Sequence, residues 1–248
     1  MKILVCISCV PDTTSKINFI NNETEFDNNG VQYIINPNDE FGLTKAIFLK
    51  QKNNAEVTVA SVGNVNCESI LRKCLAIGAD KSIRINAIAE DGFIVAKEIA
   101  SLCKTENFDL IITGRESIDY NGGMVGGLLA GILNYDYISN CIQLDIEGSK
   151  ALAAREIDGG KEILDVSLPL VIGSQKGLVE EKDLIIPNMR GIMQARQKPL
   201  SVIESCGALS RSKTKSFQKP EEKSEVKLVD PNNIQELITL LHNEAKVI

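Results

Sequence analysis

The sequence predicts an α/β protein with a mostly parallel sheet, helices on both faces, an antiparallel hairpin region and an extended C-terminal arm. Three observations support this fold class. Short apolar runs alternate with helix-like segments over the first half of the chain. Alternating apolar and polar residues then flank the turn Asp158–Gly160. A polar stretch finally separates the last amphipathic segment from the rest.

The first half of the chain supplies the parallel sheet. Lys2–Val10 is almost continuously apolar, so we expect a single buried strand there. Asn38 or Asp39 is expected to cap the next helix, because both side chains can accept backbone N–H bonds. The other expected elements are a small hairpin of Ile17–Phe19 with Val31–Ile35, helices at Phe41–Lys52, Cys67–Ala76, Asp91–Cys103 and before Leu133, and strands at Glu56–Val62, Lys81–Ile85 and Asp109–Thr113.

The second half of the chain has a different pattern, with successive strands in place of alternating strands and helices. We expect antiparallel strands at Ile138–Ile146, Ala151–Ile157 and Glu162–Leu168, then a buried strand at Pro169–Gly173. Gln175–Leu200 is a long polar segment, and such segments are usually functional or disordered. Gly207–Lys227 should be an exposed linker before a final helix that ends near Ala245. We therefore divide the chain into an α/β domain, 1–206, with a docking segment at about 175–200, and an arm, 207–248.

Composition narrows the function. The 248 residues are 44% apolar and carry a net charge of −6, so we expect no general binding of nucleic acid. No apolar run approaches the roughly 20 residues that span a bilayer, and the apolar start is too short for a secretory signal. Seven scattered cysteines indicate reduced thiols in a cytoplasmic protein.

The sequence offers little for catalysis or metal binding. Cys6 and Cys9 are three residues apart on one expected strand, which places them on opposite faces. No second C-x-x-C completes a zinc site, and His242 is the only histidine. We therefore expect neither a metal site nor an enzyme that depends on histidine.

The glycine-rich segment Gly114–Gly127 is the main candidate site. Its glycines let backbone N–H groups approach an anion, and the positive end of the following helix points at it, with Arg115 as an added cation. The simpler interpretation is a tight turn with close helix packing. The segment is neither G-x-G-x-x-G nor a P-loop, so a nucleotide bound there would be static. Asn36–Asp39 is a second candidate, although a helix cap explains it alone.

Ordered motifs carry a family resemblance. Between Lys2 and Leu200 the chain reads V-P-D-T, I-N-P-N-D-E, V-T-V-A-S-V-G, G-R-E-S-I-D, A-R-E-I-D-G-G-K-E, L-P-L-V-I-G and I-M-Q-A-R-Q-K-P-L. In order and spacing these resemble the small, β subunit of electron-transfer flavoprotein.

The resemblance implies an electron carrier with an adenine-nucleotide-binding fold. Members pair with a larger α subunit that carries most of the FAD contacts, accept electrons from acyl-CoA or other flavin dehydrogenases, and pass them to a quinone oxidoreductase. The β subunit commonly holds a structural AMP. The family's nucleotide contacts fall here on Cys6, Asn36, Pro37, Asn38, Asp39, Val62, Gly114, Arg115, Glu116, Ser117, Ile118, Asp119, Tyr120, Asn121, Gly122, Gly123, Met124 and Val125.

Two alternatives stay open beside the AMP-binding carrier. AMP-binding members typically read D-D-D-x-N-Q-T where this chain has Asp119–Val125, and Met124 and Val125 replace the Gln and Thr. Val125 and the early Val10–Thr13 are more similar to members that hold a second FAD, oxidise NADH and bifurcate electrons. An alternative from another class is a stand-alone adenine-nucleotide-binding sensor.

Two further segments are expected to meet partners. The resemblance places a dehydrogenase-docking loop at Ile186–Gln194, with Met189 where the family has an exposed Leu, flanked by Arg190 and Ile192. Met is apolar and adaptable, which suits several partners. The arm from Gly207 should pack on the α subunit through the apolar stripe Ile234–Leu241.

Overall fold

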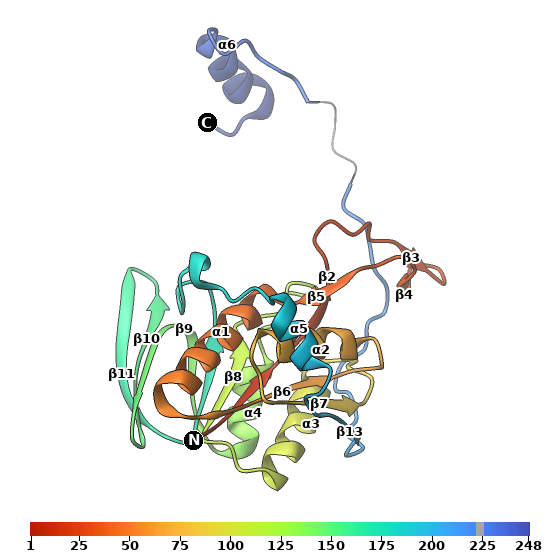
Figure 1. The fold of residues 1–248 in the computed structure, drawn as a ribbon. Coiled ribbons are helices and arrows are strands. Elements are labelled where there is room, and N and C mark those ends of the chain that lie inside the picture. The colour runs from red at the N-terminus through yellow and green to blue at the C-terminus, as the bar shows by residue number, and fades with distance from the viewer. Residues whose placement is uncertain (222–225) are drawn as a thin grey trace.

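The chain forms one large sheet with helices on both faces (Figure 1). The computed structural model describes residues 1–221 and 226–248. The sheet has nine strands in the order β11-β10-β9-β12-β8-β1-β6-β7-β13. Their bounds are β1 (Lys2–Cys6), β6 (Glu56–Val62), β7 (Lys81–Asn86), β8 (Leu110–Gly114), β9 (Asp136–Glu147), β10 (Lys150–Ile157), β11 (Gly160–Ser167), β12 (Leu170–Ser174) and β13 (Leu200–Glu204).

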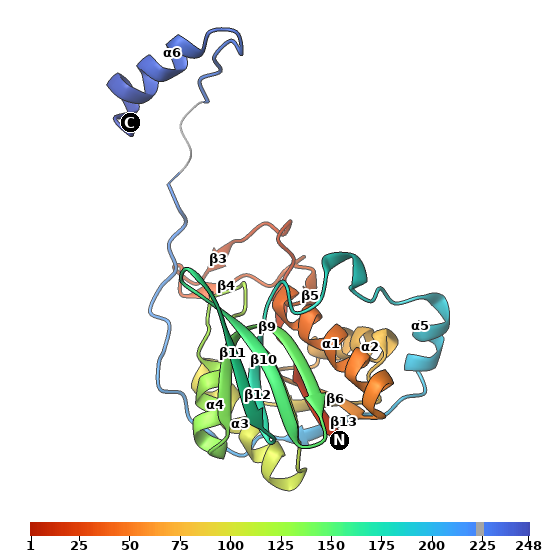
Figure 2. The ribbon, with the colours of Figure 1, turned by 90° about the vertical axis from the view of Figure 1, so that its left-hand side faces the viewer.

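The predicted parallel core and antiparallel hairpin are confirmed. All pairings from β9 to β13 in that order are parallel, whereas β10 and β11 run antiparallel beyond β9. Figure 2 shows α1 and α2 on one side of the sheet and α3 and α4 on the other. The helices are α1 (Pro37–Asn53), α2 (Cys67–Ile77), α3 (Gly92–Thr105), α4 (Val125–Leu133), α5 (Met189–Ala195) and α6 (Ile234–Thr239).

The N-terminal segment differs from the prediction of one long strand. β1 ends at Cys6, and β2 (Cys9–Pro11) pairs with β5 (Tyr33–Ile35) in a separate small sheet. Where the chain leaves the large sheet, the Ser8 N–H donates to the buried Asp39 carboxylate at 2.7 Å. The predicted hairpin of Ile17–Phe19 with Val31–Ile35 is also wrong, since β3 (Phe19–Ile20) pairs with β4 (Glu25–Phe26).

Helix α1 starts earlier than predicted. Its N-cap is Asn36, with Pro37 in the first helical position, where the missing N–H of proline costs nothing. Asn38 and Asp39 therefore lie inside the first turn and cap nothing. Their side chains are free for the contacts that shape the candidate site.

The segment after β12 is more ordered than a polar loop. It contains the turn Glu181–Asp183, helix α5 and strand β13, which pairs with β7 at the edge of the sheet. Helix α5 packs closely on α2, because a Cβ on Gly191 would come 2.5 Å from the Ala76 carbonyl oxygen.

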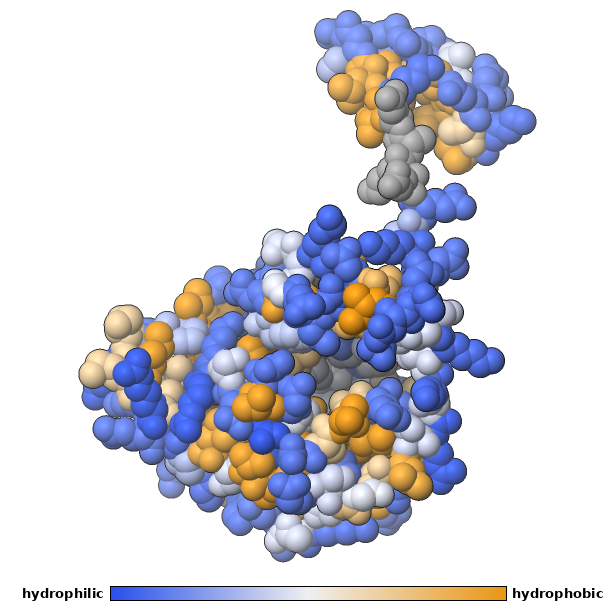
Figure 3. Space-filling view, turned by 90° about the vertical axis from the view of Figure 1, so that its right-hand side faces the viewer, coloured by the Kyte–Doolittle hydropathy of each residue, from blue (hydrophilic) through white to orange (hydrophobic). Residues whose placement is uncertain are grey.

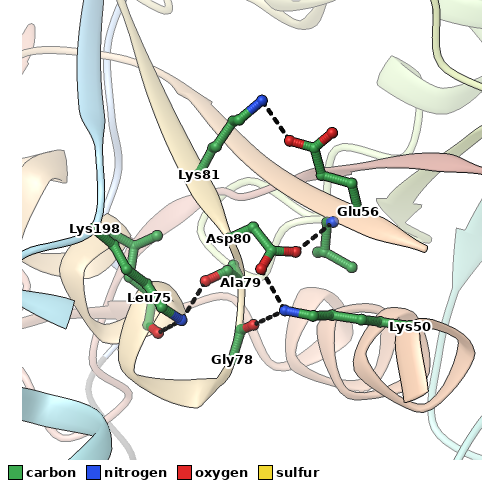
Figure 4. Close-up of polar contacts among 9 residues, drawn as sticks. Lys50, Glu56, Leu75, Gly78, Ala79, Asp80, Lys81 and Lys198 are labelled. Atoms are coloured by element: carbon green, nitrogen blue, oxygen red, sulfur yellow. Dashed lines mark hydrogen bonds and ion pairs between the residues drawn. The ribbon is translucent and has the colours of Figure 1, made fainter. Parts of the chain in front are cut away.

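Two positively charged side chains, Arg72 and Lys198, hold this segment against α2 through hydrogen bonds. Arg72 donates to the carbonyl oxygens of Ala195 and Lys198, both at 2.8 Å. The Lys198 ammonium in turn donates to Leu75 and Ala79 at 3.0 and 2.6 Å, and so satisfies carbonyls at the end of α2 (Figure 4). Burial lowers the pKa of Lys198. Beside it, Lys50 pairs with Asp80 at 2.5 Å.

The first part of the arm lies along the body. Buried Glu98 of α3 accepts from the Ser205 hydroxyl at 2.5 Å and the Cys206 N–H at 2.8 Å. Asp91, the N-cap of α3, accepts from the N–H groups of Arg211 and Ser212 at 2.6 and 2.9 Å. Residues 208–212 of the predicted linker are thus fastened to α3. Part of that linker, residues 222–225, lies outside the described residues.

The C-terminal helix stands apart from the α/β body in both ribbon views (Figures 1 and 2). Helix α6 continues as a π-helical turn, Leu240–Ala245. Ile234, Leu237 and Ile238 are exposed, and Figure 3 shows apolar side chains on this separate lobe. Within the described residues, no helix has the length and apolar character needed to cross a membrane.

Candidate functional site

A cavity of about 600 Å³ opens at the carboxyl ends of β1, β6, β7 and β8. β6 lies on one side of β1 and β8 on the other, so the chain reverses its winding direction at β1. The loops after β1 and β8 diverge at this point, where open α/β sheets form their ligand crevices. The cavity therefore sits where the sheet topology favours a ligand.

Most of the predicted site residues line this cavity. They are Cys6, Asp39, Val62, Gly114, Glu116, Ser117, Asp119, Tyr120, Gly122, Met124 and Val125. The cavity lining does not include Asn36, Pro37, Asn38, Arg115, Ile118, Asn121 or Gly123.

Asp39 connects three parts of the cavity wall. Its carboxylate accepts from the Ser8 N–H after β1 and from the Asn36 amide at 3.0 Å, and it lies against Gly114 at the end of β8. A Cβ on Gly114 would overlap the carboxylate oxygen Oδ1. Gly114 is thus required by an internal contact. Burial outweighs these hydrogen bonds and raises the pKa of Asp39 to about 7.

Asn36 and Asn38 hydrogen-bond to the backbone of the glycine-rich loop on the side away from the cavity. Both side-chain amides donate to the Glu116 carbonyl oxygen, at 2.9 and 3.1 Å. Asn36 also accepts from the Ile118 N–H at 3.3 Å. These two asparagines hold the loop backbone in place and do not face the cavity.

The Arg115 side chain has protein partners. It donates to Gln175 at 3.1 Å and to Glu116 at 2.6 Å, and Gln175 donates to Glu156 at 2.6 Å. We predicted Arg115 as a cation for an anionic ligand. In the structure its guanidinium belongs to a row of hydrogen-bonded side chains that extends through Gln175 to Glu156 of β10. The spacing in the sequence gives no sign of Gln175 as a partner.

The glycines divide into two groups. A Cβ on Gly126 would come 2.7 Å from the Thr113 hydroxyl oxygen and 2.8 Å from the Tyr137 ring, so this glycine serves close packing. Gly122 has open space, with only Ser117 Oγ at 4.0 Å, and lines the cavity. Helix α4 begins at Val125, which also lines the cavity, so its unpaired first-turn N–H groups lie at the cavity edge.

Several lining residues are absent from the sequence prediction. The loop between β7 and α3, Ala87–Gly92, forms one wall, and Ser212 and Thr214 of the arm form part of another. The first loop follows the carboxyl end of a predicted strand, so its place in the cavity wall could have been predicted from the sequence. The arm residues had no signal, because their placement depends on Asp91 and Glu98.

The cavity also contains cysteines in unlike environments. Burial raises the pKa of the Cys6 thiol well above its usual value. Cys9 and Cys67 both line the cavity, and the thiol of each shifts the pKa of the other. The neighbouring Cys9 thiol, with help from Ser61 and Arg84, lowers the pKa of Cys67 to about 7.

The predicted docking residues form an exposed apolar surface on and before α5. Met189 is 74% exposed and Ile186 is 84% exposed, with Ile192 and Met193 beside them. We call these four residues the α5 surface. Arg190 lies within the same helix and is exposed.

Comparison with known proteins gives a consistent family. A family model described as the electron transfer flavoprotein domain matches residues 24–206. The chain is 33% identical to an electron transfer flavoprotein subunit beta from Bacillus subtilis, and the alignment covers all of both chains. It is 33% identical to a protein of the same name from Syntrophomonas wolfei, over all of this chain and 98% of that relative. It is 32% identical to the Bos taurus protein of that name, over 83% of this chain and 82% of the relative.

Proposed function

Since this chain belongs to the family of electron-transfer flavoprotein β subunits, we propose that it pairs with an FAD-bearing α subunit and holds one structural AMP. In this role electrons pass from flavin dehydrogenases, through the FAD, to a quinone oxidoreductase. The FAD supplies the redox chemistry. This chain contributes a rigid body, a nucleotide cavity and surfaces for partners.

The single observation that carries the nucleotide proposal is the cavity at the start of α4. Its volume of about 600 Å³ falls in the range of small-molecule sites. The first-turn N–H groups of α4 suit a phosphate, because they lack intrahelical partners and the helix dipole favours negative charge there. Ser8, Ser117 and Tyr120 add hydroxyl groups to the cavity wall.

The charges around the cavity favour AMP over a second FAD. Arg115, the arginine nearest the α4 start in the sequence, is paired with Glu116 and Gln175 and does not line the cavity. Glu116 and Asp119 do line it. A diphosphate is longer and presents more oxygens than one phosphate, so it needs additional donors beyond the backbone of one helix end.

The α5 surface supports the docking proposal. Its four apolar side chains are exposed, while Arg72 and Lys198 fix the backbone beneath them. An exposed apolar group on a rigid base suits a protein anchor, because little order is lost on binding. We propose that flavin dehydrogenases bind here, with Met189 as the central contact.

The C-terminal arm supports the heterodimer proposal. Ile234, Leu237 and Ile238 are exposed on a helix that stands away from its own body. An amphipathic helix of this size gains stability from tertiary packing, so we propose that its apolar face packs on the α subunit.

Bulk at Gly122 tests the cavity proposal. Gly122→Val adds a side chain inside the cavity without an internal clash, whereas Gly123 lies against the Arg115 carbonyl oxygen. We expect the Gly122→Val heterodimer to release no AMP on denaturation but to keep its flavin spectrum. Gly160→Val is the matched control, since Gly160 has open space on β11. AMP retained at the wild-type level in Gly122→Val would refute the site.

A further inference from the structure

Two cysteines from separate elements meet in the cavity wall. Cys9 belongs to β2 in the small sheet, and Cys67 is the first residue of α2. The break in the strand after Cys6 places Cys9 on the small sheet, and its sulfur lies 3.8 Å from the hydroxyl oxygen of Ser61 on β6. Both cysteines line the cavity, and the Cys9 thiol lowers the pKa of Cys67.

The surroundings of Cys67 favour its thiolate. The N-terminus of α2 places positive helix-end charge at this residue. Arg84 fixes a guanidinium nearby through bonds to Glu68 at 2.9 Å and to the Gly63 carbonyl oxygen at 3.1 Å. The Cys67 thiol in turn raises the pKa of Cys9.

The remaining cysteines lack this environment. Burial raises the pKa of Cys6, Cys74, Cys103 and Cys141, which keeps them as unreactive thiols. Cys206 is exposed at the start of the arm. Cys67 therefore combines a stabilised thiolate, a path from the cavity and a second thiol within reach.

We propose that Cys9 and Cys67 are a redox-responsive pair that a hydroperoxide converts to a disulfide in the cavity wall. The Cys67 thiolate attacks the peroxide, forming an S–O bond while the O–O bond breaks and hydroxide or an alkoxide leaves, which then takes up a proton from water. The peroxide is reduced by two electrons and Cys67 becomes a sulfenic acid. The Cys9 sulfur then attacks Cys67, forming the S–S bond as the S–O bond breaks, and water leaves with the Cys9 proton. A dithiol reverses the change by exchange.

The disulfide would link β2 to the start of α2. This modification concerns the protein's own thiols, so it does not depend on which nucleotide occupies the cavity. It also does not involve the Cys6–Cys9 motif as a pair, because Cys6 stays on β1 and Cys9 leaves it.

Peptide mapping of the full chain, purified with its α subunit, tests the proposal. The complex is treated with hydrogen peroxide at neutral pH, alkylated and digested without reductant. We expect one cross-linked pair of peptides containing Cys9 and Cys67, lighter than the two reduced peptides by two hydrogen atoms and separated by dithiothreitol. Exposed Cys206 is the internal reference. It should stay reduced during the peroxide treatment and should therefore be found alkylated. Oxidation of Cys206 first, or Cys67 oxidised in the wild type with Cys9 still alkylated, would overturn the pair.

Single variants separate the two roles. Cys9→Ser should leave a Cys67 sulfenic acid that dimedone captures, whereas Cys67→Ser should leave Cys9 reduced. Cys103→Ser is the matched control on α3, outside the cavity, and should preserve the cross-link. Alkylation of Cys67 in the untreated complex should reach half its maximal rate near pH 7. A midpoint at the ~8.5 of an ordinary thiol would contradict the assigned reactivity.

Discussion

Gly114 and Asp39 lie so close that no side chain fits at position 114: a Cβ there would overlap the Asp39 carboxylate. Asp39 also holds the loop after β1 through Ser8. We therefore expect Gly114→Ala to displace Asp39 and to lower the free energy of unfolding by about 1–3 kcal/mol, as overpacking does. Chemical denaturation of the complex measures this change.

Gly131 provides the control for Gly114. It lies in α4, and no atom of the described residues lies within 4 Å of the position that a Cβ would take there. Gly131→Ala should raise stability by about 0.5–1 kcal/mol, because alanine loses less backbone entropy in a helix. Equal effects of the two substitutions on the free energy of unfolding would mean that the close Gly114–Asp39 contact does not determine stability.

The titration of Asp39 should appear in the pH dependence of stability. Its pKa in the folded chain is raised to about 7, above the ~3.9 of an unfolded Asp. A raised carboxyl pKa stabilises the fold below the unfolded pKa, and this contribution is lost as pH rises toward 7. Relative to Asp39→Asn, we expect the wild type to lose about 1.4 kcal/mol per pH unit near pH 5, with the slope falling to about half that value at pH 7, where Asp39 is half titrated.

Parallel unfolding curves at several pH values check this slope. The absolute stability of Asp39→Asn is irrelevant to the comparison, because asparagine does not titrate. If wild type and variant show the same pH slope, Asp39 is ionised throughout and the burial argument fails.

Met189→Ala should weaken docking on the α5 surface. Interface anchors typically contribute ~2 kcal/mol or more, so dehydrogenase-dependent reduction of the flavin should slow at least several-fold. The flavin spectrum should not change, since Met189 lies outside the cavity. Ile163→Ala, at an exposed apolar residue of β11, is the control and should reduce normally. Unchanged rates with each flavin dehydrogenase tested would remove Met189 from the interface.

Removal of helix α6 should weaken binding to the α subunit and leave the nucleotide cavity intact. The structure fastens residues up to Ser212 to α3 and places Ser212 and Thr214 at the cavity. A chain that lacks residues 226–248 keeps these contacts but loses α6 and its apolar face. We expect a folded body with a weakened affinity for the α subunit, measured by titration calorimetry. An affinity equal to that of the full chain would show that the arm does not bind the partner.

Periodicity predicted the parts of the fold that bury continuous apolar runs. The parallel strands β1, β6, β7 and β8 and the hairpin of β10 and β11 are confirmed. The family, which the ordered motifs indicated, is confirmed as well. The break after Cys6 was not predictable, because it depends on the tertiary bond between Ser8 and Asp39. Strand β13 was missed since five half-exposed residues carry little pattern.

The candidate site was predicted in outline but not in its contacts. Loop positions at strand carboxyl ends follow from the strand order, so residues such as Val62 and Gly122 were accessible to sequence reasoning. Contacts between residues distant in the chain were not. Asn36 turns toward the Glu116 carbonyl, and Arg115 toward Gln175, for reasons of packing that leave no local pattern.

Quantifying the nucleotides released from the purified heterodimer tests the central claim most directly. Denaturation followed by chromatography and mass measurement gives their identity and ratio to protein. We predict one FAD and one AMP per heterodimer. Two FAD and no AMP would contradict this account in favour of a bifurcating subunit, and one FAD with no second nucleotide would leave the glycine-rich loop as packing alone.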